Sequence, residues 1–171
     1  MSFQSTVFIN QGLGVAGDLF TNGPRKAESF RLVSADAAYN VFGRAFTVTS
    51  EGLAAAGGTG VFAGILSNPK GSALLGTSVG GTLAPSLVLP NNAQGELMTM
   101  GSLIVALPAA AAIGDLVIYN TTTGELATIA PGADLPANRA FAQAYVDYFT
   151  VADAGLAVIT LSPTLITPVP A

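Results

Sequence analysis

Residues 114–130 read Gly-Asp-Leu-Val-Ile-Tyr-Asn-Thr-Thr-Thr-Gly-Glu-Leu-Ala-Thr-Ile-Ala, and this stretch decides the fold class. Two runs, residues 116–119 and 126–129, are rich in the β-branched and aromatic residues that suit a half-buried pleated surface. Between them, Asn120 and Gly124 supply a turn, because Asn tolerates positive φ and Gly adopts it without a steric clash. The stretch is therefore predicted to form a β-hairpin, with the rest of the chain laid against it as further strands.

Short apolar runs separated by Gly and Pro recur along the chain, and no long amphipathic helix interrupts them. Residues 51–60 hold three consecutive alanines and then three glycines, which predicts a loop or a short helical turn. Residues 139–151 alternate as a strand would, although 140–144 could begin a helix. Further strands are predicted at residues 5–9, 30–33, 41–49, 61–66, 73–75, 87–89, 96–100, 102–107 and 156–161. The pattern indicates an all-β fold, a compact antiparallel β-barrel or sandwich.

The 171 residues suit one domain with extended ends. Residues 1–29 are predicted to form an extended N-terminal arm, because their many glycines and Pro24 prevent a long helix. Residues 30–161 form the predicted barrel or sandwich. Residues 162–171 hold three prolines and are predicted to be an extended C-terminal tail.

The composition points to a surface that binds partners and away from catalysis. Only 9% of the residues are charged and 50% are hydrophobic, whereas a typical domain has about 25% charged residues. Such a neutral surface favours burial against partners. Cysteine and histidine are both absent, which removes thiol chemistry, the commonest general base and the commonest metal ligand. No catalytic residues, cofactor or metal site are predicted.

Dinucleotides and nucleic acids are both disfavoured as ligands. Residues 12–17 read Gly-Leu-Gly-Val-Ala-Gly and match a dinucleotide-binding pattern. Gly23 and Pro24 follow too closely to leave room for the helix that such a site needs. The net charge of −4 also disfavours general binding to nucleic-acid phosphates.

Four of the six basic residues lie early in the chain: Arg25, Lys26, Arg31 and Arg44. This cluster indicates a solvated patch more than a partner contact.

A membrane span is also disfavoured. Residues 97–114 carry no charge, but Pro108 and Gly101 interrupt them. Glu96 and Asp115 flank the stretch, where Lys or Arg would be expected. Two short strands account for this stretch better than a membrane helix does.

Several motifs, in order along most of the chain, resemble a family of tailed-bacteriophage head proteins, the capsid cement or decoration proteins. The most extended is Gly14-Val15-Ala16-Gly17-Asp18-Leu19-Phe20 followed by Asn22-Gly23-Pro24-Arg25. The other matching motifs are Gly64-Ile65-Leu66 with Asn68-Pro69-Lys70, Gly81-Thr82-Leu83-Ala84-Pro85, Met98-Thr99-Met100-Gly101, and Ile113-Gly114-Asp115 before Thr121-Thr122-Thr123-Gly124. The alanine-rich stretch near Ala54 and the Pro-rich tail have no counterpart that we can match.

The resemblance implies a β-rich structural protein on the outer surface of an icosahedral phage head. It implies that the protein cements neighbouring major capsid subunits and often assembles as a homotrimer. The acidic composition also suits the outer face better than the DNA-lined interior. Major capsid protein and other copies of this chain are therefore the expected partners, and no nucleic acid or membrane is expected.

The N-terminal arm is predicted to be the docking element and not part of the protein's own core. Its isolated strand is too short to be stable alone, and its backbone groups could be satisfied by strand addition to a neighbouring subunit. Its glycines would let the chain turn closely over that surface. The predicted partner-contacting residues are Phe3, Val7, Phe8, Ile9, Gly14, Val15, Gly17, Asp18, Phe20, Asn22, Pro24, Arg25 and Lys26.

Two other functions remain open from the residues. One is a host-glycan or cell-surface binding module on the virion. The other is a polysaccharide hydrolase that uses a pair of carboxylates. The candidates for that pair are Asp115, Glu125, Asp147 and Asp153, which are interpreted as turn and surface carboxylates.

Overall fold

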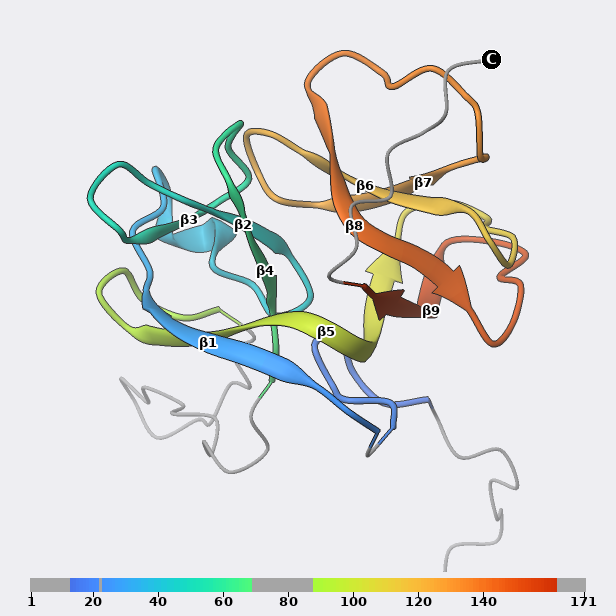
Figure 1. The fold of residues 1–171 in the computed structure, drawn as a ribbon, viewed down its shortest axis with the longest axis horizontal. Coiled ribbons are helices and arrows are strands. Elements are labelled where there is room, and N and C mark those ends of the chain that lie inside the picture. Colours follow the sequence, from blue (N-terminus) through green and yellow to red (C-terminus); the bar gives the residue numbers. More distant parts are fainter. Residues whose placement is uncertain (1–12, 22, 69–87, 163–171) are drawn as a thin grey trace, which may run out of the picture.

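The protein is an all-β structure (Figure 1). The computed structural model describes residues 13–21, 23–68 and 88–162. These residues form nine strands and one short 3₁₀ helix, Ala37–Tyr39. The strands are β1 (Lys26–Arg31), β2 (Ala45–Val48), β3 (Ala54–Ala56), β4 (Phe62–Leu66), β5 (Gln94–Leu107), β6 (Leu116–Asn120), β7 (Leu126–Ile129), β8 (Arg139–Asp147) and β9 (Gly155–Leu161).

The strands form one antiparallel sheet in the order β3-β2-β4-β5-β9-β8-β6-β7, with β1 also paired to β5. Strand β5 is the longest and belongs to both halves of the sheet. Its first half pairs with β1 and β4, and its second half, from Gly101 onward, pairs with β9. Gly101 adopts a φ of 117°, which suits glycine far better than other residues. Figure 1 shows β5 turning sharply between the two halves.

The sheet encloses two apolar clusters. The larger one lies mainly on β5, β6, β8 and β9, with Val105, Tyr119 and Ile159, and also takes in Ala45 from β2 and Ile65 from β4. The smaller one lies around β2, β3 and β4 and includes Phe46 and Leu66. Because β5 contributes to both clusters, the two halves share one backbone element and form one domain.

The ends of the sheet meet through a turn. The turn between β6 and β7 lies against β2 and the residues that follow β3. Gly124 accepts a hydrogen bond at its carbonyl from the Ala45 N–H at 2.9 Å, and Thr121 accepts one from the Gly58 N–H at 2.6 Å. These contacts link the turn to the sheet end without a continuous strand ladder. The fold is therefore sandwich-like and is not a closed barrel.

The predicted hairpin is confirmed as β6 and β7, with Leu116 opposite Ile129. The strand interpretation of residues 139–151 is confirmed for residues 139–147, as β8, which ends at Asp147, and the helix alternative is wrong. Ala142, Ala144 and Val146 alternate as buried residues. The strands predicted at 96–100 and 102–107 are the single bent strand β5.

Other predictions differ from the structure. Residues 51–60 contain the strand β3, which sequence reasoning missed because alanine has weak strand propensity. Small side chains fit there because Ala54 and Ala56 pack in the smaller cluster. The strand predicted at residues 30–33 starts earlier, at Lys26, and the one at 41–49 is confined to β2. The predicted strands at 5–9 and 73–75 lie outside the described residues. Of 87–89, Val88 makes an isolated bridge to Val41.

Gly57 tests the contact that joins the two sheet ends. It has a φ of 70°, and a Cβ placed there would lie 2.7 Å from the Thr121 carbonyl oxygen. Gly57→Ala is expected to lower the free energy of unfolding by about 3 kcal/mol, combining backbone strain with the clash. Gly132 is the matched control, because its φ is 82° and no atom lies within 4 Å of its would-be Cβ. Gly132→Ala should lose only about 1 kcal/mol in chemical denaturation. Equal losses of unfolding free energy in the two variants would mean that the close approach of Gly57 to the Thr121 carbonyl adds nothing to the cost of the substitution.

Candidate functional site

The chain before β1, here called the N-terminal segment (residues 13–25), runs along the second half of β5. The Gly17 N–H donates to the Ile104 carbonyl at 2.8 Å, and the Ile104 N–H donates to the Asp18 carbonyl at 2.8 Å. The Phe20 N–H donates to the Ser102 carbonyl at 3.0 Å. Leu19 packs against the larger apolar cluster. Residues 17–20 are thus held on the chain's own sheet, and the prediction that the arm lies outside the protein's own core is wrong for them.

Asp18 fixes the turn that begins this segment. Only 6% of Asp18 is exposed. Its carboxylate accepts hydrogen bonds from the Asn68 side-chain amide at 3.2 Å and from the Val15 N–H at 3.4 Å. The Asn68 N–H also donates to the Gly17 carbonyl at 2.7 Å. This carboxylate therefore joins the N-terminal segment to the end of β4.

The glycines of the segment allow close packing on the protein's own surface. Gly17 has a φ of 90°, and a Cβ there would lie 2.8 Å from the Phe42 Cβ. Gly14 has a φ of 130° and lies against Asp18 and Ile104. The dinucleotide-like spacing is thus explained by a turn that lies against residues 42 and 43. The sequence analysis had assigned this close approach to a partner surface.

Part of the segment faces outward. Val15 is 44% exposed, and Phe20 packs edge-on against Tyr148 with ring centroids 4.7 Å apart. Tyr148 is itself 51% exposed. Pro24 and Arg25 are exposed and lie beside Gly101, at the bend of β5. Val15, Phe20 and Tyr148 therefore give this side an apolar and aromatic surface, and Pro24 and Arg25 are exposed nearby at the bend of β5.

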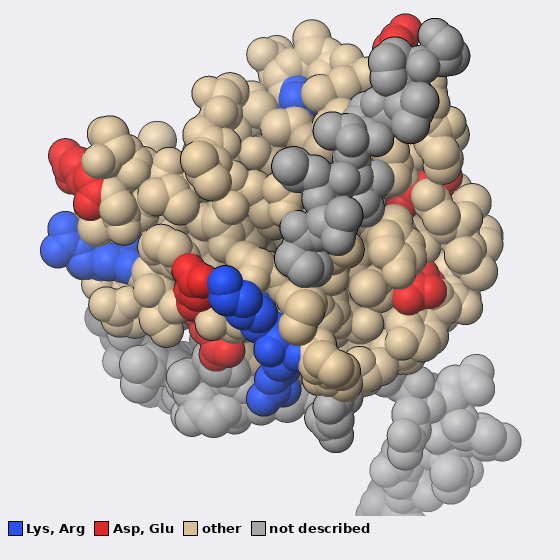
Figure 2. Space-filling model, viewed as in Figure 1, with Lys and Arg blue, Asp and Glu red and all other residues tan. Residues whose placement is uncertain are grey.

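Charges on this side are sparse and of both signs. Figure 2 shows acidic and basic side chains interspersed in the region of β1, while most of this face is uncharged. Lys26 pairs with Glu28 at 2.8 Å within β1. Lys26, one of the predicted partner-contacting residues, thus already has a carboxylate from its own strand.

Five of the predicted contact residues lie outside the described residues: Phe3, Val7, Phe8, Ile9 and Asn22. Tyr148 directly follows β8, at the place where the alternation of Ala142, Ala144 and Val146 would put the next buried residue. Its φ of 68° ends the alternation and leaves the ring exposed against Phe20. No sequence pattern predicts that pair, because it joins residues far apart in the chain.

Three of the four candidate carboxylates have partners within the chain. Asp115 accepts a hydrogen bond from the Ala112 N–H at 2.8 Å, and Glu125 pairs with Arg44 at 2.8 Å. Asp147 accepts hydrogen bonds from the Tyr148 N–H at 2.8 Å and the Thr160 hydroxyl at 2.9 Å. These contacts support the interpretation of turn and surface carboxylates.

The described part of the chain contains no metal-ligand cluster and no membrane helix. No three His, Cys, Asp or Glu residues gather there in a way that could hold a metal ion. Within the same ranges, no helix is long and apolar enough to cross a membrane.

Comparison with known families gives a match over nearly the whole chain. The profile of the family described as structural cement protein (E217 gp24/Pam3 gp6) matches residues 3–162. The chain belongs to this family. The cement protein is accordingly a structural virion protein that stabilises a phage capsid, is located on the head and associates with capsid proteins. The family implies a structural, non-enzymatic role.

A solved structure has a similar fold. It is a chain from the capsid of Myoviridae phage XM1, with a TM-score of 0.63 and 16% sequence identity. The match covers 96% of the cement protein and 100% of that chain. No curated protein sequence matches the cement protein. At this identity the XM1 chain supports the fold, and the family match supports the role.

Asp18 provides a test of how firmly the N-terminal segment is attached. Asp18→Ala removes the acceptor for the Asn68 amide and the Val15 N–H in a buried place. The expected loss is about 1–3 kcal/mol in the free energy of unfolding. Asp153→Ala, at an exposed turn position, should change it by less than about 0.5 kcal/mol. A loss at Asp18 no larger than the control would show that the segment is not held by this carboxylate.

Proposed function

We propose that the cement protein binds the outer surface of the head and clamps neighbouring major capsid subunits through its N-terminal segment and the residues before it. One observation carries the proposal. Residues 17–20 are hydrogen-bonded along β5, so the chain leading to residue 13 starts from a fixed point beside exposed Val15. A chain anchored in this way can transmit force between two capsid subunits. A pull on the residues before 13 would pass to β5 through these hydrogen bonds.

The residues before the fixed point have the composition of a docking strand. Phe3, Val7, Phe8 and Ile9 would gain by burial against a partner, roughly 1.5–3 kcal/mol for each Val, Ile or Phe fully buried. Their backbone groups could pair with a free sheet edge of a capsid subunit. Residues 14–25 would extend the contact, with Val15, Phe20, Asn22, Pro24 and Arg25 facing the partner.

We also propose that the protein assembles as a homotrimer on the head. Few charges and several exposed apolar side chains favour self-association, among them Val61 at 75% exposed and Ile113 at 57% exposed. The net charge of −4 supports binding to capsid protein over binding to nucleic acid. The proposed role involves no membrane contact and no catalytic step.

Truncation separates docking from folding. A variant that lacks residues 1–12 should keep the melting temperature of the full chain, because the hydrogen bonds from Gly17 onward remain. It should fail to bind purified heads that were made without the cement protein, as measured by co-sedimentation. A longer truncation that lacks residues 1–24 should also melt at a lower temperature, because it removes Asp18 and Leu19.

The two truncations can contradict the proposal in different ways. Full binding by the variant that lacks residues 1–12 would place the docking surface elsewhere on the protein. An unchanged melt for the variant that lacks residues 1–24 would show that residues 17–20 are not part of the stable fold.

The homotrimer is tested independently of the capsid. Mass photometry of the free protein should show trimers at micromolar concentration, and imaging of heads should show three copies meeting at each site. Isolated single copies at every site on the head would refute the trimer while leaving the docking proposal intact.

A further inference from the structure

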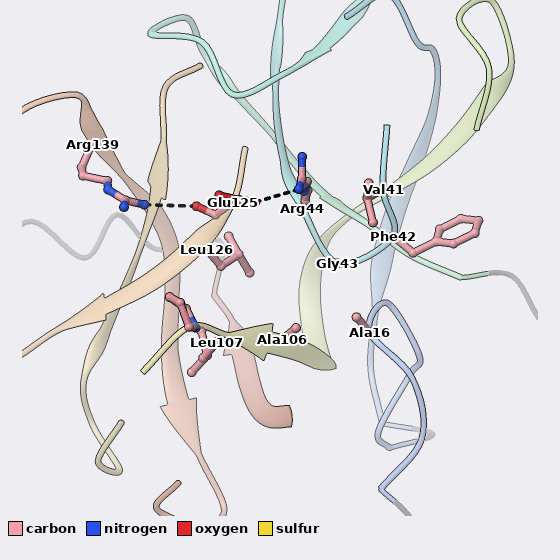
Figure 3. Close-up of a pocket in the computed structure, with 11 residues that line it drawn as sticks. Ala16, Val41, Phe42, Gly43, Arg44, Ala106, Leu107, Glu125, Leu126 and Arg139 are labelled. Atoms are coloured by element: carbon pink, nitrogen blue, oxygen red, sulfur yellow. Dashed lines mark hydrogen bonds and ion pairs between the residues drawn. The ribbon is translucent and has the colours of Figure 1, made fainter. Parts of the chain in front are cut away.

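A cavity of about 440 Å³ opens beside the N-terminal segment (Figure 3). Its walls come from Ala16, from residues 41–44 before β2, from residues 106–108 at the end of β5, and from the start of β7 with Arg139. It therefore lies where the two ends of the sheet approach each other. We call it the Arg139 pocket.

The floor of the Arg139 pocket is apolar. Leu107 and Leu126 line it and are each 3% exposed, whereas Figure 3 shows the Phe42 ring directed away from them. Ala106 also lines it and is exposed, so this side chain stands at the opening. Pro108 lines it as well and is also exposed, so an apolar side chain entering the pocket would cover Ala106 and Pro108 and release water from them.

The rim carries three charges in a row. In Figure 3, Glu125 lies between Arg44 and Arg139. Arg44 pairs with the Glu125 carboxylate at 2.8 Å and donates to the Thr123 carbonyl at 3.2 Å, so it is already engaged. Arg139 donates to the Glu125 main-chain carbonyl at 3.4 Å, and no carboxylate among the described residues forms an ion pair with it. The rim therefore has one excess positive charge, in a chain whose net charge is −4.

We propose that the Arg139 pocket binds a segment of the major capsid protein that carries an apolar side chain next to an Asp or Glu. The apolar side chain would fill the floor, and the carboxylate would meet the Arg139 guanidinium, whose planar donors suit a carboxylate. The partner's identity rests on the proposed function. Ala16 forms one wall of the pocket and Val15 is exposed next to it, so a subunit bound to the N-terminal segment is within reach of the pocket.

The charges favour an acidic segment over a basic one. A Lys or Arg from the partner could approach the Glu125 carboxylate, but it would face two guanidinium groups. An acidic side chain would face two guanidinium groups and one carboxylate already paired with Arg44. Charge complementarity of this kind sets partner choice more than raw affinity, and it weakens as salt is added.

Two variants test the floor and the rim, with heads made without the cement protein as the probe. Ala106→Trp should fill the pocket, and Arg139→Glu should reverse the rim charge. Each is expected to weaken binding to heads at least about tenfold. The matched controls are Ala152→Trp and Arg31→Glu, at exposed positions that do not line the pocket. The controls should bind within about twofold of the wild type, and all four variants should keep the wild-type melt.

Each result decides a different point. Wild-type binding by both pocket variants would overturn the pocket proposal and leave the proposed function standing. Weakening by Ala106→Trp with unchanged or tighter binding by Arg139→Glu would also overturn it, because the occupant would then not be acidic. Loss of self-association by Ala106→Trp in mass photometry would assign the pocket to a second copy of this chain instead. Failure of the wild-type protein to bind heads would overturn the proposed function itself.

Discussion

The structure depends on the bend of β5 at Gly101. The strand pairs with β1 and β4 before this residue and with β9 after it, so one backbone serves both halves of the sheet. A Cβ at position 101 would lie 3.2 Å from the Arg25 Cβ and from the Met98 Cε, at a φ of 117° that disfavours any side chain. The same glycine therefore sets the angle between the halves and lets the N-terminal segment pass close to the bend.

This arrangement connects folding to the structural role. Residues 17–20 complete the hydrogen bonding of β5 beyond the bend, and Leu19 adds to the larger apolar cluster. The N-terminal segment, which we propose to bind the capsid, is thus hydrogen-bonded directly to β5, the strand that joins the two halves of the sheet. Force on the docking residues would be carried by antiparallel hydrogen bonds and a buried carboxylate. Exposed side-chain contacts alone would be weaker, since surface ion pairs contribute little.

The local signals in the sequence predicted most of the strands, and they carried no information on which distant strands pair. The β6–β7 hairpin and β8 followed from alternation and turn residues, which are local properties. Strand β3 was missed because three alanines carry no strand signal, and its place is set by packing in the smaller cluster. The family motifs pointed to Gly17 and Asp18, but the residues they contact, Phe42 and Asn68, are distant in sequence. The Phe20–Tyr148 pair and the Arg139 pocket arise in the same way, from the folding of distant segments onto one another.

This protein stabilises the phage head. The most direct test is to heat DNA-filled heads with and without bound protein and to record when a dye first reaches the packaged DNA. Heads saturated with the cement protein should release DNA at a clearly higher temperature than bare heads, and adding the protein back to bare heads should restore that temperature. An identical release temperature for bare and saturated heads would contradict the account.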